Sequence, residues 1–346
     1  MPGAIENPPG YRIEGKLGEG GFACVYKATH LRTKRPCALK SVDISTLSKR
    51  QRDIAIHQWL VEVGALLKVS AHPNVVGYRK AFDTGWQLWV EMELCVAGDL
   101  GHYFEGWSSR ISRTVKRKIM LDTSAAVSYL HDKGIVHRDI KAENVLISYT
   151  GGHETDIIAK LTDFGLAKVI ASVNLEGDLE TYYMDSNCGT RYYLAPEVLQ
   201  KKYTLKADIF SMAVLFVAIV SETRIGDYMT GYIKDNTGKC WPFGEYMLTT
   251  KLDIALRANF GAGDNLRNLV NSMLKFDYHK RPSAKEIHKT LSTTVLAEEF
   301  PKDPCNRAGK LGRLILKNDL VQERPLPRVP APIGRNLPKI VTLPQK

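Results

Sequence analysis

Residues 11 to about 92 alternate apolar and polar positions in short runs, the period-two pattern of β-strands. The clearest runs are Tyr11–Ile13, Val25–Ala28, Cys37–Lys40 and Leu88–Met92. One stretch, Ile54–Val69, instead repeats its apolar residues at helical spacing. The N-terminal part is therefore predicted to be a small sheet with one helix.

After Gly98 the pattern becomes mainly helical. The predicted helices are Lys116–His131, Asp208–Val220, Asn265–Phe276 and Ala284–Thr293. Strands followed by helices predict an α+β protein with two lobes, at about residues 11–94 and 95–298. A Pro/Gly-rich flexible leader, residues 1–10, precedes the lobes, and a basic, Pro-rich, largely disordered tail, residues 299–346, follows them.

The formal net charge of +11 belongs mainly to the tail. Ten Lys/Arg against three Asp/Glu place a charge of +7 between Pro301 and Lys346. This segment lacks the interleaved aromatic residues on which nucleic-acid bases stack. We therefore expect no specific nucleic-acid binding.

The composition also indicates where the protein resides. No stretch approaches 18 apolar residues, so no membrane span is predicted. The six cysteines are scattered without a C-x-x-C pair, as reduced thiols usually are. No basic and apolar signal segment stands at the start. We expect an intracellular protein, in the nucleus, the cytoplasm or both.

A glycine-rich turn, Gly18–Val25, lies between two predicted strands. Glycines let backbone N–H groups close over phosphates, although many such turns are ordinary hairpins. Lys40 on the next strand can neutralise those phosphates, the alternative being a lysine that faces solvent. Glu62 on the predicted helix can hold Lys40 by an ion pair, or else it is an exposed helix residue.

A second set of candidate catalytic residues lies in His137–Asn144. Asp139 can accept the proton of a substrate hydroxyl, and Lys141 can steady a migrating phosphoryl group. Asn144 and Asp163 offer the hard oxygen ligands that Mg²⁺ prefers. Together with the glycine-rich turn, these residues predict phosphoryl transfer from a nucleotide.

The ordered set of motifs resembles the eukaryotic protein kinase superfamily over about residues 11–298. The resemblance implies a bilobal fold, with an antiparallel N-lobe sheet plus one helix and a mainly helical C-lobe. It also implies ATP and Mg²⁺, with Mn²⁺ as a substitute, and a protein substrate with Ser or Thr. The nucleotide contacts that it implies are Leu17, Gly18, Gly20, Gly21, Val25, Ala38, Lys40, Met92, Glu93, Cys95, Asp99 and Leu146.

The same resemblance gives some of these residues particular roles. Val25, Ala38 and Leu146 would enclose the adenine ring. The hinge around Glu93 and Cys95 would bind its edge. Four residues would stack between the lobes, and these are Leu66, Tyr78, His137 and Phe164. Further positions that it marks are the ion pair of Glu197 with Arg281, and Asp208, which would brace the catalytic loop.

Lys141 and Thr190 are similar to the serine/threonine branch of the superfamily. Tyr203–Phe210 and Gly231–Lys234 look like the kinase group that binds a PDZ-LIM cytoskeletal protein. The alternative to an active enzyme is a pseudokinase scaffold that binds partners without catalysis. A scaffold need not keep every catalytic residue, and this chain has them all.

Two regulatory features are predicted. Ser186 resembles an activating phosphorylation site, and Arg138 would bind its phosphate. Thr181, Tyr182 and Tyr183 are the alternative phosphorylation sites. Arg324–Pro330 has the spacing of a polyproline helix for an SH3-type partner, while the tail's charge suits an acidic partner. The alternative for the tail is a solvated basic linker.

Overall fold

The computed structural model describes residues 7–20, 23–106, 111–153, 155–164, 168–169, 190–221, 232–234, 240–256 and 262–300. All of these belong to one compact unit, Met1–Leu316. The predicted tail beyond residue 300 and the start of the leader lie outside the described residues.

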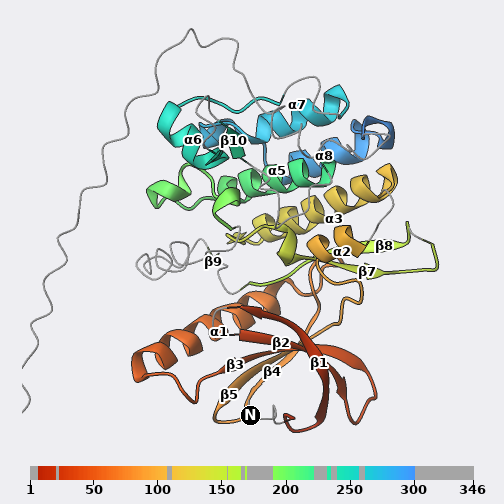
Figure 1. The fold of residues 1–346 in the computed structure, drawn as a ribbon, viewed down its shortest axis with the longest axis vertical. Coiled ribbons are helices and arrows are strands. Elements are labelled where there is room, and N and C mark those ends of the chain that lie inside the picture. Colours follow the sequence, from red (N-terminus) through yellow and green to blue (C-terminus); the bar gives the residue numbers. More distant parts are fainter. Residues whose placement is uncertain are drawn as a thin grey trace, which may run out of the picture. The chain divides into compact units, whose positions relative to one another are not determined.

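The N-terminal strands form one antiparallel sheet of five strands in the order β1-β2-β3-β5-β4 (Figure 1). Its strands are β1 (Tyr11–Gly20), β2 (Ala23–His30), β3 (Pro36–Asp43), β4 (Tyr78–Asp83) and β5 (Gln87–Met92). In the ladders, Val25 of β2 lies opposite Lys40 of β3, and Ala38 of β3 lies opposite Met92 of β5. This register places the glycine-rich turn, Lys40 and the end of β5 on neighbouring strands.

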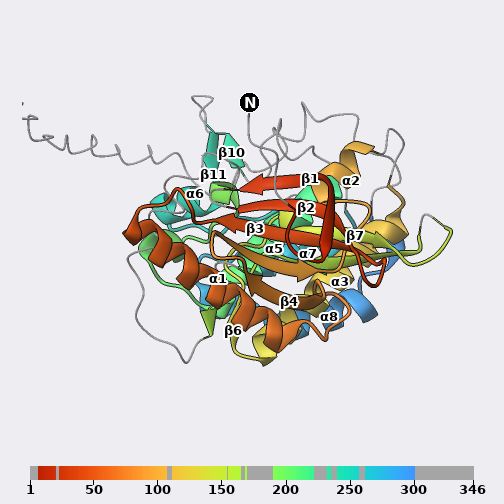
Figure 2. The ribbon, with the colours of Figure 1, turned by 90° about the horizontal axis from the view of Figure 1, so that it is seen from below.

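Helix α1 (Lys49–Val69) lies against this sheet (Figure 2). It begins earlier than the predicted Ile54 because a capping box stabilises its start. There the Ser48 side chain accepts a hydrogen bond from the backbone N–H of Gln51, whose side chain accepts one from Ser48. The buried side of α1 includes one charged residue, Glu62.

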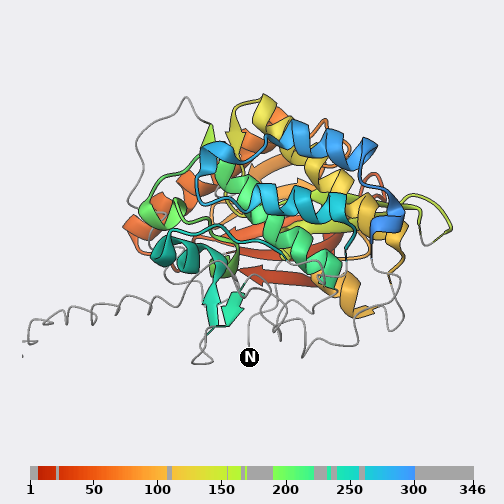
Figure 3. The same ribbon diagram turned by 90° about the horizontal axis from the view of Figure 1, so that it is seen from above.

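The C-terminal part is built around α5 (Leu205–Ser221), in which every residue from Ala207 to Val220 is buried. A helix that is apolar on all sides belongs in a core. Helices α3 (Arg113–Asp132) and α7 (Asp264–Met273) pack on α5, and α8 (Ala284–Thr293) packs on α3 (Figure 3). Two short helices, α2 (Leu100–Gly106) and α6 (Phe243–Thr250), complete the α-helices among the residues described.

Short strands position the catalytic loop. Strand β6 (Ile135–Val136) pairs with β9 (Lys168–Val169), and β7 (Val145–Tyr149) pairs with β8 (Ile157–Leu161). Strands β10 (Tyr232–Lys234) and β11 (Cys240–Pro242) form a separate pair. The loop at residues 137–144 therefore runs from β6 to β7, and Asp163 follows the end of β8.

The predicted α+β class and the N-lobe sheet with one helix are confirmed. The bounds predicted for α8 agree with the structure. The end predicted for α7 is wrong, because the helix stops at Met273 and Leu274 has left helical geometry. Helices α2 and α6 were not predicted, since one or two turns give little periodicity. The lobe boundaries stay a prediction.

Among the residues described, no helix combines the length and apolarity that a membrane span requires. Cys24, Cys37 and Cys95 are free thiols.

A buried polar contact fastens the start of β1 to the middle of the sheet. The Tyr11 hydroxyl donates to Oε2 of Glu91 at 2.6 Å, and Nη1 of Arg79 donates to Oε1 of the same carboxylate at 3.4 Å. Both Tyr11 and Glu91 are buried. Burial and the neighbouring carboxylate raise the pKa of Tyr11 above its ordinary value.

Tyr11→Phe should lower the free energy of unfolding by about 1.5–3 kcal/mol at neutral pH, because Glu91 loses a charge-assisted hydrogen bond. A raised phenol pKa means that this contribution is complete below about pH 10 and is lost as the pH rises above it. Urea unfolding from pH 7 to 11 measures the effect. Tyr149→Phe, at an exposed tyrosine, is the control. Equal midpoints for the two variants at pH 7 would contradict the prediction.

Candidate active site

Three segments bring their charges together at Lys40, in the middle of β3. Its Nζ donates to both carboxylate oxygens of Glu62 on α1, at 2.8 Å each, and to Oδ1 of Asp163 after β8, at 3.0 Å. The Lys40 and Glu62 side chains are 14% and 6% exposed. The ion pair expected for Glu62 is therefore present, and the alternative of an exposed helix residue is wrong.

Lys40 and Asp163 each stabilise the charged form of the other. Burial lowers the pKa of Lys40, but Asp163 and Glu62 more than reverse this and raise it above its ordinary value. Lys40 in turn lowers the pKa of Asp163 to about 2. Burial raises the pKa of Glu62 against the attraction of Lys40. At neutral pH the site therefore offers a fixed ammonium beside a fixed Asp163 carboxylate.

The catalytic loop is held by its backbone. The carboxylate of Asp208, buried at the start of α5, accepts the N–H groups of His137 and Arg138 at 2.9 Å each. Arg138 has a φ of 72°, a conformation that non-glycine residues rarely adopt, so this anchor stabilises a strained turn. The bracing expected for Asp208 is thus present. His131 of α3 also contacts this carboxylate, with its Nε2 at 2.9 Å.

Asp139 has two differently placed carboxylate oxygens. Its Oδ2 lies 2.9 Å from Nδ2 of Asn144 and 2.8 Å from Nζ of Lys141. The same Asn144 amide donates to the backbone oxygen of Asp139 at 2.8 Å. Oδ1 of Asp139 is buried and has no hydrogen-bond partner within the described part of the chain. One oxygen is thus fixed by neighbours, and the other can accept a proton from a hydroxyl group.

The donor set at Asn144 and Asp163 fits Mg²⁺ bound together with a nucleotide. Because Nδ2 of Asn144 binds Asp139, the amide oxygen of Asn144 is the atom left for a metal. The described residues contain no group of three or more His, Cys, Asp or Glu side chains that could hold a metal ion. Mg²⁺ in nucleotide sites usually takes one or two protein ligands and completes its shell with phosphates and water.

The predicted adenine site lies where β3 meets the end of β5. Ala38, Met92 and Cys95 are buried there, and Val25 and Leu146 are partly buried. No described backbone hydrogen bond uses the carbonyl of Glu93 or the N–H of Cys95. One acceptor and one donor on this segment match the edge of an adenine.

Two of the predicted nucleotide contacts have other partners as well. The Glu93 carboxylate binds Nζ of Lys160 at 2.8 Å and the N–H of Gly77 at 2.7 Å, so only the backbone of Glu93 suits adenine. Oδ1 of Asp99 accepts the backbone N–H of His102 at 3.0 Å, which caps α2. The kinase resemblance implies that Asp99 lies near the ribose. Its carboxylate would then bind both the ribose and the start of α2.

The glycine-rich turn is described only in part. Leu17 is 51% exposed, Gly18 pairs with Val25, and Gly20 pairs with Ala23 at the end of β1 and β2 that the turn connects. Gly21 lies outside the described residues, as do Ser186 and its three alternative acceptors.

The residues expected to connect the two lobes lie in one core. Leu66 and Phe164 are buried in the same cluster, and Tyr78 packs against it. The ring of His137 meets that of Phe164 edge to face, with centroids 5.1 Å apart. Nε2 of His137 also lies 2.9 Å from the carbonyl oxygen of Thr162, which connects the catalytic loop to the segment before Asp163.

Sequence reasoning missed two supporting residues of this site, His131 and Lys160. Each is common in type and far along the chain from its partner, 77 positions for His131 and Asp208. The sequence contains no local signal for either contact.

Comparison with known proteins agrees with this arrangement. The protein kinase domain family matches residues 11–291. The chain is 28% identical over 290 residues to the serine/threonine-protein kinase atg1 of Dictyostelium discoideum, covering 82% of this chain and 39% of that protein. It is 27% identical over 276 residues to serine/threonine-protein kinase 33 of Mus musculus, covering 78% and 52%.

A third relative, the serine/threonine-protein kinase ATG1a of Arabidopsis thaliana, is 30% identical over 212 residues, which cover 61% of this chain and 31% of the relative. The match thus spans about a third to a half of the length of these relatives. The kinase domain nevertheless accounts for most of this sequence, and its relatives carry the serine/threonine activity in their names. The chain therefore belongs to the protein kinase family.

Proposed function

We propose that this chain is an active kinase that transfers the γ-phosphoryl group of ATP to serine or threonine hydroxyls of a protein. The observation that carries the proposal is the geometry of Asp139. Neighbours fix its Oδ2, and its buried Oδ1 has no partner in the described part of the chain. A carboxylate oriented in this way is placed to act as a base toward a hydroxyl.

In the proposed reaction the hydroxyl oxygen of the substrate forms a bond to the γ-phosphorus, and the bond from that phosphorus to the ADP oxygen breaks. The hydroxyl proton passes to Oδ1 of Asp139. Lys141 places a cation 2.8 Å from the opposite oxygen of Asp139, next to the path of the phosphoryl group. Lys40 neutralises the other phosphates. Bound Mg²⁺, held by Asn144 and Asp163, would supply charge neutralisation.

A pseudokinase scaffold is the weaker alternative. Such a protein gains nothing from a buried ion pair between Lys40 and Glu62, nor from the strained, anchored backbone at Arg138. Burying an ion pair costs desolvation free energy, and a rare backbone conformation strains the folded state. Together with the fixed carboxylate of Asp139, they favour catalysis over partner binding alone.

A positional peptide library with ATP and Mg²⁺ tests the proposal directly. We expect phosphate to be transferred to peptides with a Ser or Thr acceptor and not to peptides with Tyr. Asp139→Asn, which keeps the size of the side chain, should remove the transfer. Equal transfer by wild type and Asp139→Asn would assign the activity to a contaminant. Binding of ATP without any transfer would favour the scaffold.

Ser186 is proposed as the activating phosphorylation site. A phosphate there would bring nearly two negative charges to Arg138, whose guanidinium lies 4.5 Å from the centre of the Tyr203 ring. Ser186→Ala should lower activity about tenfold, whereas Thr181→Ala should leave it unchanged. Phosphopeptide mapping together with peptide phosphorylation rates measures both. A fully active Ser186→Ala enzyme, from cells in which Ser186 is phosphorylated, would refute the assignment.

The intracellular location, the kinship with the PDZ-LIM-binding kinase group and the partner of the tail also remain proposals. Arg324–Pro330 supports an SH3-type partner through its spacing of Arg and Pro. Failure of residues 301–346 to bind any member of an SH3-domain panel would leave the tail as a solvated linker.

A further inference from the structure

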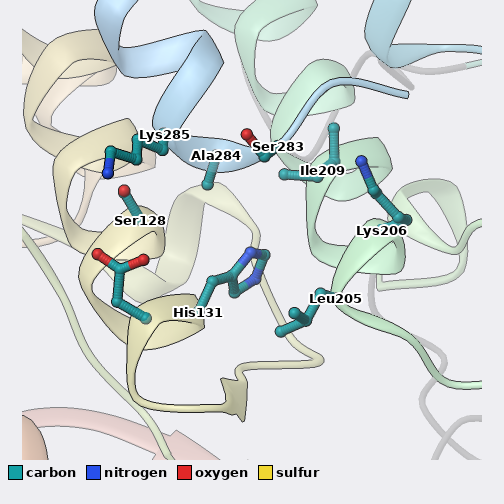
Figure 4. Close-up of a pocket in the computed structure, with 9 residues that line it drawn as sticks. Ser128, His131, Leu205, Lys206, Ile209, Ser283, Ala284 and Lys285 are labelled. Carbon is teal, nitrogen blue, oxygen red and sulfur yellow. The ribbon is translucent and has the colours of Figure 1, made fainter. Parts of the chain in front are cut away.

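A pocket of about 190 Å³ lies where the end of α3 meets the starts of α5 and α8 (Figure 4). Its wall includes Ser128 and His131 from α3, Leu205 and Lys206 from α5, and Ala284 and Lys285 from α8. Apart from His131, which contacts the carboxylate of Asp208, none of these residues has a role in the nucleotide or phosphoacceptor sites described above.

The size of the pocket limits what it can take. Pockets for drug-sized ligands measure about 300–1,000 Å³, so this one suits a single side chain rather than a nucleotide. Leu205, Ile209 and Ala284 give it apolar surface. Protein interfaces draw much of their affinity from one apolar side chain that fills a pocket of this kind.

The charges at the pocket suit an acidic segment. Lys206 and Lys285 come from different helices. Glu286 of α8 attracts the charge of Lys206, whereas Lys285 is exposed and forms no ion pair within the described part of the chain. The ammonium of Lys206 donates to the backbone oxygen of Arg281. Asp132 is the one carboxylate of the lining, so an excess of positive charge remains. The tail of this chain, with a charge of +7, does not match such a surface.

The pocket also adjoins the support of the catalytic loop. His131 lies in its wall, and the Nε2 atom of this residue is 2.9 Å from Oδ2 of Asp208. The same carboxylate holds the backbone N–H groups of His137 and Arg138. A side chain bound in the pocket would therefore touch the residue that shares Asp208 with the catalytic loop.

We propose that this pocket binds a short acidic segment of a partner protein, through one apolar side chain in the pocket and flanking carboxylates against Lys206 and Lys285. The site is separate from the phosphotransfer residues, so its test does not depend on the proposed function.

The test uses the full chain and the fluorescein-labelled peptide Gly-Glu-Glu-Phe-Glu-Gly, with fluorescence anisotropy as the measurement. Ser128→Phe, which fills the pocket, should weaken binding at least about tenfold. Lys285→Glu, which reverses an exposed charge, should weaken it at least about fivefold. Lys289→Glu, one turn further along α8, is the matched control and should change it less than about twofold. A peptide with Ser in place of Phe should not bind.

Thermal melting of each variant separates lost binding from lost folding. The exposed position of Lys285 makes Lys285→Glu the decisive variant if Ser128→Phe is unstable. The proposal is overturned if wild type does not bind the peptide, or if Lys285→Glu and Lys289→Glu bind it equally. It is also overturned if free 3-phenylpropionate displaces the peptide at equal affinity, since the pocket would then take a small carboxylate.

Discussion

Asparagine in place of Asp163 is expected to lower kcat on the order of 10²–10³-fold while the protein stays folded. Asp163 has a φ of 63°, and Asn tolerates this left-handed backbone as well as Asp does. The substitution also keeps the size of the side chain. It removes the negative charge, which the low pKa of about 2 maintains at every physiological pH.

The measurement is kcat at saturating ATP and Mg²⁺, together with the melting temperature. Asp53→Asn, at an exposed position of α1, makes the same chemical change outside the site and should leave kcat unaltered. Lys40→Met should reduce activity about as much as Asp163→Asn, because both Glu62 and Asp163 lose their cation. Near-wild-type phosphorylation by Asp163→Asn in Mg²⁺ would show that the Asp163 carboxylate is not needed for transfer.

The sequence predicted the active site better than the fold around it. Asp139, Lys141 and Asn144 stand within six positions, and the structure places their side chains around one carboxylate. Glu62 was harder to identify from the sequence, because its partner Lys40 lies 22 positions away and an exposed helix carboxylate was the simpler expectation. The structure decides this by burying Glu62 on the side of α1 that faces β3.

What the sequence could not predict depends on contacts between distant segments. The binding of the Glu93 carboxylate to Lys160 changes how that residue can serve the hinge, and Lys160 lies on a strand formed 67 positions later. The start of α1 depends on a side-chain cap at Ser48, which periodicity does not detect. Short-range patterns thus predict motifs and long helices, whereas tertiary partners decide which atoms of each motif remain available.

Removing one partner of the buried Glu197–Arg281 pair should destabilise the protein more than loss of any surface ion pair. Nη1 and Nη2 of Arg281 donate to the two oxygens of Glu197 at 2.6 and 2.9 Å. Both side chains are almost fully buried, at 0% and 4% exposed. The guanidinium also donates to the backbone oxygens of Lys275 and Lys206, and it lies 5.1 Å from the centre of the Phe210 ring.

Arg281→Met should lower the free energy of unfolding by about 3–5 kcal/mol, because Glu197 would be left as an unpaired buried carboxylate. For a domain of this size the melting temperature should fall on the order of 10 °C. Lys275→Met is the control, because it breaks a half-exposed pair with Asp253 that is worth less than about 1 kcal/mol.

A double variant separates loss of the pair from loss of volume. Glu197→Gln combined with Arg281→Met leaves no uncompensated charge, so it should be clearly less destabilised than the sum of its single changes. Urea unfolding of the four proteins measures this coupling. If Arg281→Met proved no less stable than Lys275→Met, the buried pair would contribute nothing to stability.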